Sequence, residues 1–240
     1  MSEQVSIKDK YHQVLHRITE SAKSVGRKPE EIRLIVVTKT QPLEKIQMLI
    51  EAGAVNFGEN YIEEAVPKIQ ALSIRKELQW HMIGHVQSRK AEDVCLYFQY
   101  LHSLDSIKLA QRLSRFALMM DKIVPVWLEF NVSGEESKSG WNISEEEYWA
   151  KLIPEIDTIF TLPKLDLLGV MTIPPYSENQ EASRAYYRKL REFLEFVRKH
   201  LQLAGFKELS MGMSTDFEIA IQEGSTCVRI GQAILGPRKG

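Results

Sequence analysis

The chain has 240 residues, of which 44% are hydrophobic and 26% are charged, and its formal net charge at pH 7 is −1. This composition is that of an ordinary globular protein, large enough to bury a full core without disulfides. The small net charge excludes a general electrostatic attraction to nucleic acid or to an anionic membrane.

Two cysteines, Cys95 and Cys227, lie in apolar contexts and have no partner at metal-ligand spacing. We therefore expect two buried thiols in a reducing compartment, with no metal site and no disulfide framework. The N-terminal residues are polar, unlike a secretory signal, and no apolar run is long enough to span a membrane. These features predict a cytoplasmic protein that binds neither nucleic acid nor membrane.

The first predicted element is an amphipathic helix from Val5 to Val25, in which apolar residues recur at helical spacing. Short apolar runs and amphipathic segments then alternate to the end of the chain. The expected strands are 32–39, 54–60, 78–84, 100–105, 123–132, 165–173, 207–213 and 226–231. The expected helices between them are 43–53, 61–72, 88–98, 106–120, 144–160, 180–201 and 214–224.

Local signals refine three of these helices. Asp105 is placed to cap the helix at 106–120. Ser144 and Glu147 form a capping-box pattern at the start of the helix at 144–160. Pro67 should kink or shorten the helix at 61–72.

Eight strands alternating with helices over 240 residues predict a single α/β domain, a (β/α)8 TIM barrel covering residues 1–240. Residues 1–27 would form an extra N-terminal helix packed on the barrel. An open doubly wound sheet is the alternative, but eight repeats without a glycine-rich first turn favour closure.

Active sites of such barrels lie at the C-terminal ends of the strands, and phosphate is often held after the last two. In the segment "GMST", Gly212 permits close backbone approach and Ser214 offers a hydroxyl. Gly231 and the backbone N–H of Gln232 would face them from "RIG" and the residue after it. The alternative is that Ser214 only caps a helix and Gly231 only turns the chain, and these segments alone do not decide.

Lys39 ends the apolar run "LIVVTK" and falls on the same side of the strand as Ile35 and Val37. A lysine at a strand end more often extends its amine into water. If this side faces the barrel interior, desolvation would lower the pKa of the amine, and a nearby Arg229 would lower it further. A neutral amine attacks aldehydes. A phosphate site opposite such a lysine suggests pyridoxal 5′-phosphate (PLP), which carries an aldehyde and a phosphate on one ring.

The sequence resembles the PLP homeostasis protein family, whose fold is the PLP-binding barrel of the alanine racemase N-terminal domain. The similar motifs are "VVTKTQP", "NFGENYIEEA", "WHMIGHVQSRK", "HSLDSIKLA", "EFNVSGEESKSG", "GVMTIPP" and "ELSMGMSTDFEIAIQEGSTCVRIGQAILGPR". The resemblance implies that Lys39 forms the internal aldimine and that Arg229 contacts the pyridine nitrogen. It also implies phosphate contacts from Ser214, Gly231 and Gln232, and places Asn60 and Met211 near the ring.

Three positions depart from the pattern that this family often shows. Thr38 stands where serine is common, and Arg89 stands where "QSRK" would otherwise read "QSNK". Gln232 stands where threonine is common, so one hydroxyl donor to phosphate is lost while the backbone N–H remains.

The function implied by the resemblance is that of a PLP carrier or buffer in vitamin B6 and amino-acid homeostasis. A guanidinium cannot accept a hydrogen bond, so Arg229 favours an unprotonated ring nitrogen, which is a poorer electron sink. The resembled racemases use a second acid or base from an additional β-domain, for which we expect no room after the eighth unit. We therefore expect a monomer without catalytic residues that passes PLP to apo PLP-dependent enzymes.

Two enzymatic alternatives remain. The first is a weak PLP-dependent amino-acid racemase that uses Lys39 as one base, with His81 and His85 as candidates at the rim for the second. The second is a phosphosugar aldolase-like barrel, although the lysine of such barrels usually follows a later strand than the first. Lys138 is a further candidate contact to the anion, but a solvated loop lysine is the simpler interpretation.

Overall fold

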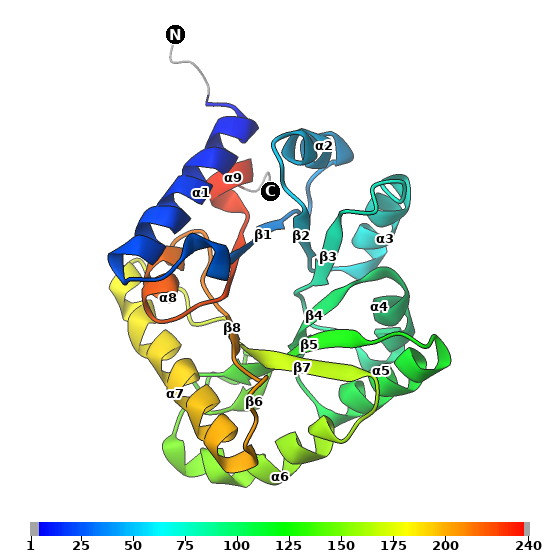
Figure 1. The fold of residues 1–240 in the computed structure, drawn as a ribbon, viewed down its shortest axis with the longest axis vertical. Helices are drawn as coiled ribbons and strands as arrows, with labels where there is room; N and C mark the ends of the chain where they lie inside the picture. Colours follow the sequence, from blue (N-terminus) through cyan, green and yellow to red (C-terminus); the bar gives the residue numbers. More distant parts are fainter. Residues whose placement is uncertain (1–4, 238–240) are drawn as a thin grey trace.

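The computed structural model of the protein describes residues 5–237. Its central feature is a parallel sheet that closes on itself to form a barrel (Figure 1). The strands of the barrel are β1 (Arg33–Val37), β2 (Asn56–Glu59), β3 (Gln79–Met82), β4 (Tyr100–Leu104), β5 (Val124–Asn131), β7 (Leu165–Met171), β8 (Glu208–Ser210) and β9 (Cys227–Ile230).

The pairing of β1 with β9 closes the barrel. Ile35 lies opposite Arg229 in this pair, while on the other side of β1 Val36 lies opposite Phe57 of β2. Every neighbouring pair around the ring is parallel, including β4 with β5. The predicted (β/α)8 barrel is therefore confirmed, and the open sheet is wrong.

Helices surround the barrel on its outside (Figure 1). They are α1 (Ile7–Ser24), α2 (Leu43–Glu51), α3 (Ile62–Ala71), α4 (Ala91–Tyr97), α5 (Ile107–Met119), α6 (Trp149–Phe160), α7 (Ser183–Leu201), α8 (Phe217–Gln222) and α9 (Gln232–Leu235). Single 3-10 turns are η1 (Pro29–Glu31), η2 (Ser88–Lys90), η3 (Glu146–Tyr148) and η4 (Gln180–Ala182). Each expected helix is present, and α3 continues through Pro67 to Ala71.

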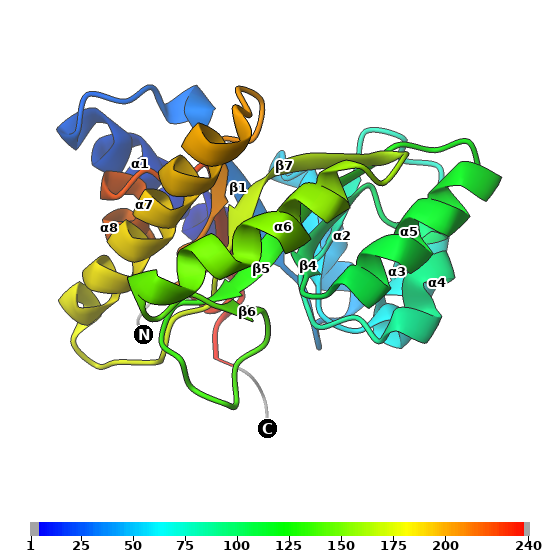
Figure 2. The same ribbon diagram turned by 90° about the horizontal axis from the view of Figure 1, so that it is seen from below.

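Two elements were not expected from the sequence. β6 (Trp141–Asn142) pairs in parallel with the last residues of β5 and lies below the barrel in Figure 2. The short helix α9 follows β9 directly, with Gly231 at its start. Both lie at the end of the barrel where the strands have their carboxyl termini.

Two capping predictions are wrong. Ser106, not Asp105, caps α5, because its hydroxyl accepts the Leu109 N–H at 3.4 Å. The Asp105 carboxylate instead accepts a hydrogen bond from His85 Nδ1 at 2.7 Å. The Asp105 carboxylate, which the local sequence placed at the helix start, is therefore bonded to a side chain distant in sequence.

The predicted capping box at Ser144 is also absent. The first turn is the 3-10 segment η3, and α6 begins only at Trp149, with no side chain capping it. The Ser144 N–H donates to the Asn142 side chain in the turn that follows β6. The turn after β6 and the 3-10 segment η3 thus occupy the residues at which the first turn of the helix was expected.

The N-terminal helix α1 packs beside α8 and α9 (Figure 1). The Ser21 hydroxyl donates to the Glu218 carbonyl at 3.0 Å, and Arg27 donates to the carbonyls of Ile221 and Ser225. Between residues 5 and 237, no helix is both long and apolar enough to cross a lipid bilayer.

Candidate functional site

A cavity of about 300 Å³ opens at the carboxyl ends of β1, β2 and β9. It is lined by Val37, Lys39, Gln41, Asn60, Ile83, Ile173, Tyr176, Met213, Ser214, Thr215, Arg229, Gly231, Gln232, Leu235 and Gly236. Six of the seven residues selected from the sequence line this one cavity. The seventh, Met211, is fully buried and lies outside the lining, where Met213 stands instead.

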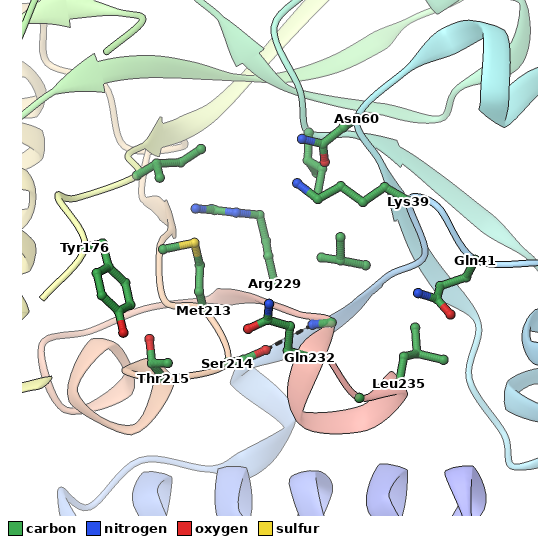
Figure 3. A pocket seen from close by; sticks show the side chains of 15 residues that line it. Lys39, Gln41, Asn60, Tyr176, Met213, Ser214, Thr215, Arg229, Gln232 and Leu235 are labelled. Atoms are coloured by element: carbon green, nitrogen blue, oxygen red, sulfur yellow. Dashed lines mark hydrogen bonds between the residues drawn. The ribbon is translucent and has the colours of Figure 1, made fainter. Parts of the chain in front are cut away.

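Lys39 lies in the turn that follows β1. Ile35 belongs to a small apolar cluster with Trp127 and Met171, while Val37 lines the cavity. Figure 3 shows the Lys39 side chain extending across the cavity with its amine beside Asn60. The strand alternation read from the sequence therefore places this amine at the mouth of the barrel rather than among the outer helices.

Ser214 closes the opposite side of the cavity. Its hydroxyl oxygen accepts the N–H of Gly231 at 3.2 Å (Figure 3). It also accepts the N–H of Ala233 at 3.3 Å. These amides belong to the N-cap residue and the first turn of α9. Ser214 thus caps a helix, but the helix is α9, which lies beside it on the same side of the cavity, and not α8, which follows it in sequence.

Gly212 brings the loop after β8 close to α8. Its φ is +99°, in a region that favours glycine, and a Cβ there would lie 2.6 Å from the Cβ of Ala220. The close approach that the structure shows at Gly212 is to helix α8, and the expected approach to a phosphate stays a prediction.

Arg229, on β9, lies at the floor of the cavity and is almost fully buried. One terminal nitrogen donates to the Ser210 hydroxyl at 2.6 Å and the other to the Thr172 carbonyl at 2.8 Å. Burial lowers the pKa of this guanidinium. Its charge persists at neutral pH because arginine begins from a very high pKa.

Behind Arg229, a chain of hydrogen bonds runs down the barrel interior. His102 Nδ1 lies 2.8 Å from the Ser210 hydroxyl, and His102 Nε2 lies 3.0 Å from His81 Nδ1. His81 Nε2 lies 3.2 Å from Asn56 Oδ1. His102 stacks on Trp127, and His81 stacks on a tyrosine of β4.

The protons in this chain have one consistent direction. Burial lowers the pKa of both His81 and His102 well below the usual value, so both rings are neutral. Because Asn56 Oδ1 only accepts, each histidine donates from Nε2 and accepts at Nδ1. Ser210 then donates to His102 and accepts from Arg229, so every member of the chain is satisfied.

The two histidines considered for acid–base work do not line the cavity. His81 is inside the barrel, within the chain just described. The side chain of His85 is 58% exposed and pairs with Asp105. Within the described residues, no group of three or more His, Cys, Asp or Glu side chains is arranged to hold a metal ion.

Comparison with known proteins agrees with this geometry. The family model described as "Alanine racemase, N-terminal domain" matches residues 12–239. Pyridoxal phosphate homeostasis proteins of Pseudomonas aeruginosa and Aquifex aeolicus are 40% and 38% identical to this chain. These matches cover 97% and 96% of this chain, and 96% and 98% of those relatives. The chain belongs to the pyridoxal phosphate homeostasis protein family.

Solved structures agree with this membership. PipY of Synechococcus elongatus, solved with PLP bound, is 31% identical with a TM-score of 0.79, over 91% of this chain and 100% of PipY. An alanine racemase of Clostridium difficile is 19% identical with a TM-score of 0.62, over 94% of this chain and 57% of the racemase. The latter likeness shows a shared fold only.

Arg89, which departs from the usual family motif, lines a second cavity of about 520 Å³ beside Asn60 and Lys90. Its Nε donates to the Gln87 side chain at 2.9 Å. Lys138 lies outside the first cavity, with its amine 3.4 Å from the Pro174 carbonyl.

Several lining residues were not selected from the sequence, among them Gln41, Tyr176, Met213, Thr215 and Leu235. Tyr176 belongs to the "PPYSENQ" segment, whose proline-rich and polar composition does indicate a rim loop. Leu235 belongs to α9, whose single turn carries no periodic signal.

Proposed function

We propose that this protein binds PLP as a Schiff base on Lys39 and acts as a PLP carrier or buffer in vitamin B6 and amino-acid homeostasis. The observation that carries the proposal is that Lys39 and the Ser214–α9 pair face one cavity from opposite sides, with Arg229 at its floor. PLP supplies an aldehyde that condenses with a primary amine.

The lining fits such a ligand. The Asn60 side-chain oxygen is buried and has no hydrogen-bond partner among the described residues, so the cavity offers an acceptor that a bound group can satisfy. The Ser214 hydroxyl oxygen accepts two amide N–H groups at the start of α9, so its proton is directed elsewhere and can be donated to a dianionic phosphate. Gly231 and Gln232 lie at this same helix start.

Arg229 would meet the ring nitrogen of the cofactor. Because its guanidinium can only donate, it would hold that nitrogen unprotonated. The chain from Ser210 through His102 supports this state, since the Ser210 proton is directed away from Arg229. A PLP ring held in this form is a weaker electron sink, which suits storage better than carbanion chemistry.

The position of the histidines favours the carrier over a racemase. A racemase needs a second acid or base opposite Lys39, and neither His81 nor His85 lines the cavity. Tyr176 does line it, but this tyrosine is 81% exposed on the rim loop and is not held in place as a catalytic group would be. In the carrier proposal Lys39 would hold PLP, and its amine would be released unchanged when an incoming free amine takes its place, so PLP can pass to apo PLP-dependent enzymes. We propose a monomer located in the cytoplasm, in keeping with two free, buried cysteines.

Titration with PLP tests the proposal. The wild-type protein should develop the absorbance band of a protonated Schiff base, and Lys39→Ala should abolish it. Lys108→Ala is the matched control, because Lys108 is exposed on α5 and does not line the cavity. A band that survives in Lys39→Ala contradicts the proposal. Sustained deuterium exchange at Cα of alanine would instead support the racemase.

A further inference from the structure

The turn that carries Lys39 has an unusual backbone. It is closed by a hydrogen bond from the Gln41 N–H to the Thr38 carbonyl at 3.0 Å. Thr40 has a φ of +61°, in the left-handed region. A β-branched residue rarely adopts this conformation, so the turn is strained and needs support from its surroundings.

That support comes from helix α3. Glu64 Oε1 accepts the Thr40 N–H at 2.5 Å. One helical turn later, Lys68 Nζ donates to the Thr38 carbonyl at 2.9 Å and to Glu64 Oε1 at 2.5 Å. The two side chains therefore hold the backbone on both sides of Lys39.

A third member, Glu59, comes from the end of β2 and is completely buried. Its Oε1 accepts the Thr38 hydroxyl at 2.7 Å and Lys68 Nζ at 2.9 Å. The three acceptors of Lys68 match the three protons of an ammonium group. We call Glu59, Glu64 and Lys68 the turn clamp.

Stability alone gives a poor account of the turn clamp. Buried ion pairs lose much of their attraction to desolvation, and apolar side chains of similar size often stabilise a fold as well. Burial raises the pKa of Glu59, which reflects this desolvation. What such groups supply well is a fixed geometry, and here the geometry fixed is that of the backbone around Lys39.

We propose that the turn clamp is a set of positioning residues that holds the Thr38–Gln41 turn so that the Lys39 amine is presented to the cavity. The inference rests on the proposed function of Lys39. It gives a role to the "GENYIEEA" segment, which contains Glu59 and Glu64 but of which only Asn60 lines the main cavity.

Glu64 is the residue to test, because Lys68→Met would leave Glu59 buried without a cation and would compromise folding. Glu64→Ala should weaken PLP binding about tenfold, the size expected when a strained turn is released. Glu64→Gln should lose less, since an amide oxygen can still accept the Thr40 N–H. Glu63→Ala is the matched control: Glu63 neighbours Glu64 on α3, its side chain is 70% exposed, and it pairs with Lys90.

A second background separates positioning from a general effect on stability. Thr40→Gly removes the strain, so Glu64→Ala should cost only about twofold in binding when Thr40 is already glycine. Equal losses in the two backgrounds, or wild-type affinity of Glu64→Ala, would overturn the proposal. Circular dichroism and thermal unfolding establish that each variant is folded.

A PLP-free readout makes failure of this inference distinguishable from failure of the proposed function. Trinitrobenzenesulfonate modifies accessible lysine amines, and peptide mass spectrometry gives the rate at Lys39 relative to Lys108, which is exposed on α5 and remote in sequence from the turn. Glu64→Ala should change this ratio severalfold and Glu63→Ala should not. An unchanged ratio overturns the turn clamp even if PLP binds. A changed ratio without PLP binding overturns only the function of Lys39.

Discussion

Arg229 donates a hydrogen bond to the Ser210 hydroxyl at 2.6 Å, and this bond joins the floor of the cavity to the interior of the barrel. Ser210 lies on β8 and Arg229 on the neighbouring strand β9. Through Ser210, the guanidinium is held by a chain that extends to Asn56 of β2.

Removing the Ser210 hydroxyl should therefore disturb two partners together. Ser210→Ala leaves one Arg229 nitrogen and His102 Nδ1 without a partner in a buried place. We expect a loss of about 1–3 kcal/mol in the free energy of unfolding. Urea denaturation measures it, with Ser133→Ala on the rim loop as control. A variant as stable as the wild type would contradict the role assigned to Ser210 as the shared partner of Arg229 and His102.

From the buried carboxyl of Glu129 we predict a contribution to the free energy of unfolding that falls as pH rises above the ordinary glutamate pKa. This β5 residue is buried, and its Oε2 has no partner among residues 5–237. Burial, assisted by repulsion from Asp105, raises the pKa of Glu129 to about 7 against the nearby cations Arg229 and Lys138. The folded state therefore binds a proton that the unfolded state releases between the ordinary glutamate pKa and about 7.

It follows that Glu129 lowers stability as pH rises through this window, by about 3 kcal/mol when the window is passed. Glu129→Gln should gain about that amount at pH 8 and little at pH 4.5. Urea unfolding across this range gives the difference in the free energy of unfolding between Glu129→Gln and the wild type. His81 and His102 change stability with pH in the opposite direction to Glu129, but both proteins contain them, so their contributions cancel in this difference. The exposed Glu136→Gln serves as control, and a gain that does not change with pH would contradict the prediction.

Ser214 should determine how strongly the cavity prefers a ligand that carries a phosphate over the same ligand without one. Ser214→Ala removes the hydroxyl that faces Gly231 and the first turn of α9. The preference for PLP over pyridoxal, which lacks the phosphate, should fall about tenfold, because hydrogen bonds to charged groups are worth about 1.5–3 kcal/mol. Thr215→Ala, at the neighbouring lining position, is the control. If the ratio of dissociation constants is retained in Ser214→Ala, the phosphate is held elsewhere.

Hydrophobic periodicity was enough to predict the barrel and the position of Lys39. Ile35 and Val37 alternate with outward residues, and this alternation predicts where the next side chain in register points. The features missed depend on partners distant in sequence. Ser214 caps a helix 17 residues further on, and β6 exists only because β5 lies beside it.

The interior chain could not be predicted from single residues. His81 and His102 each follow an aromatic or aliphatic strand residue, and the same letters are compatible with a rim position. Whether His81 and His102 are buried depends on how far each one lies from the carboxyl end of its strand, and local sequence determines the ends of strands poorly. The exchange of Met211 for Met213 has the same origin, since β8 ends at Ser210 and the chain then turns at Gly212.

The central claim is that Lys39 is the lysine that reacts with PLP. The most direct measurement is reduction of the PLP-loaded protein with borohydride, followed by digestion and peptide mass spectrometry. We predict that the pyridoxyl group is found on the peptide containing Lys39. A pyridoxyl group on Lys45, Lys138 or any other lysine, with Lys39 unmodified, would contradict the account.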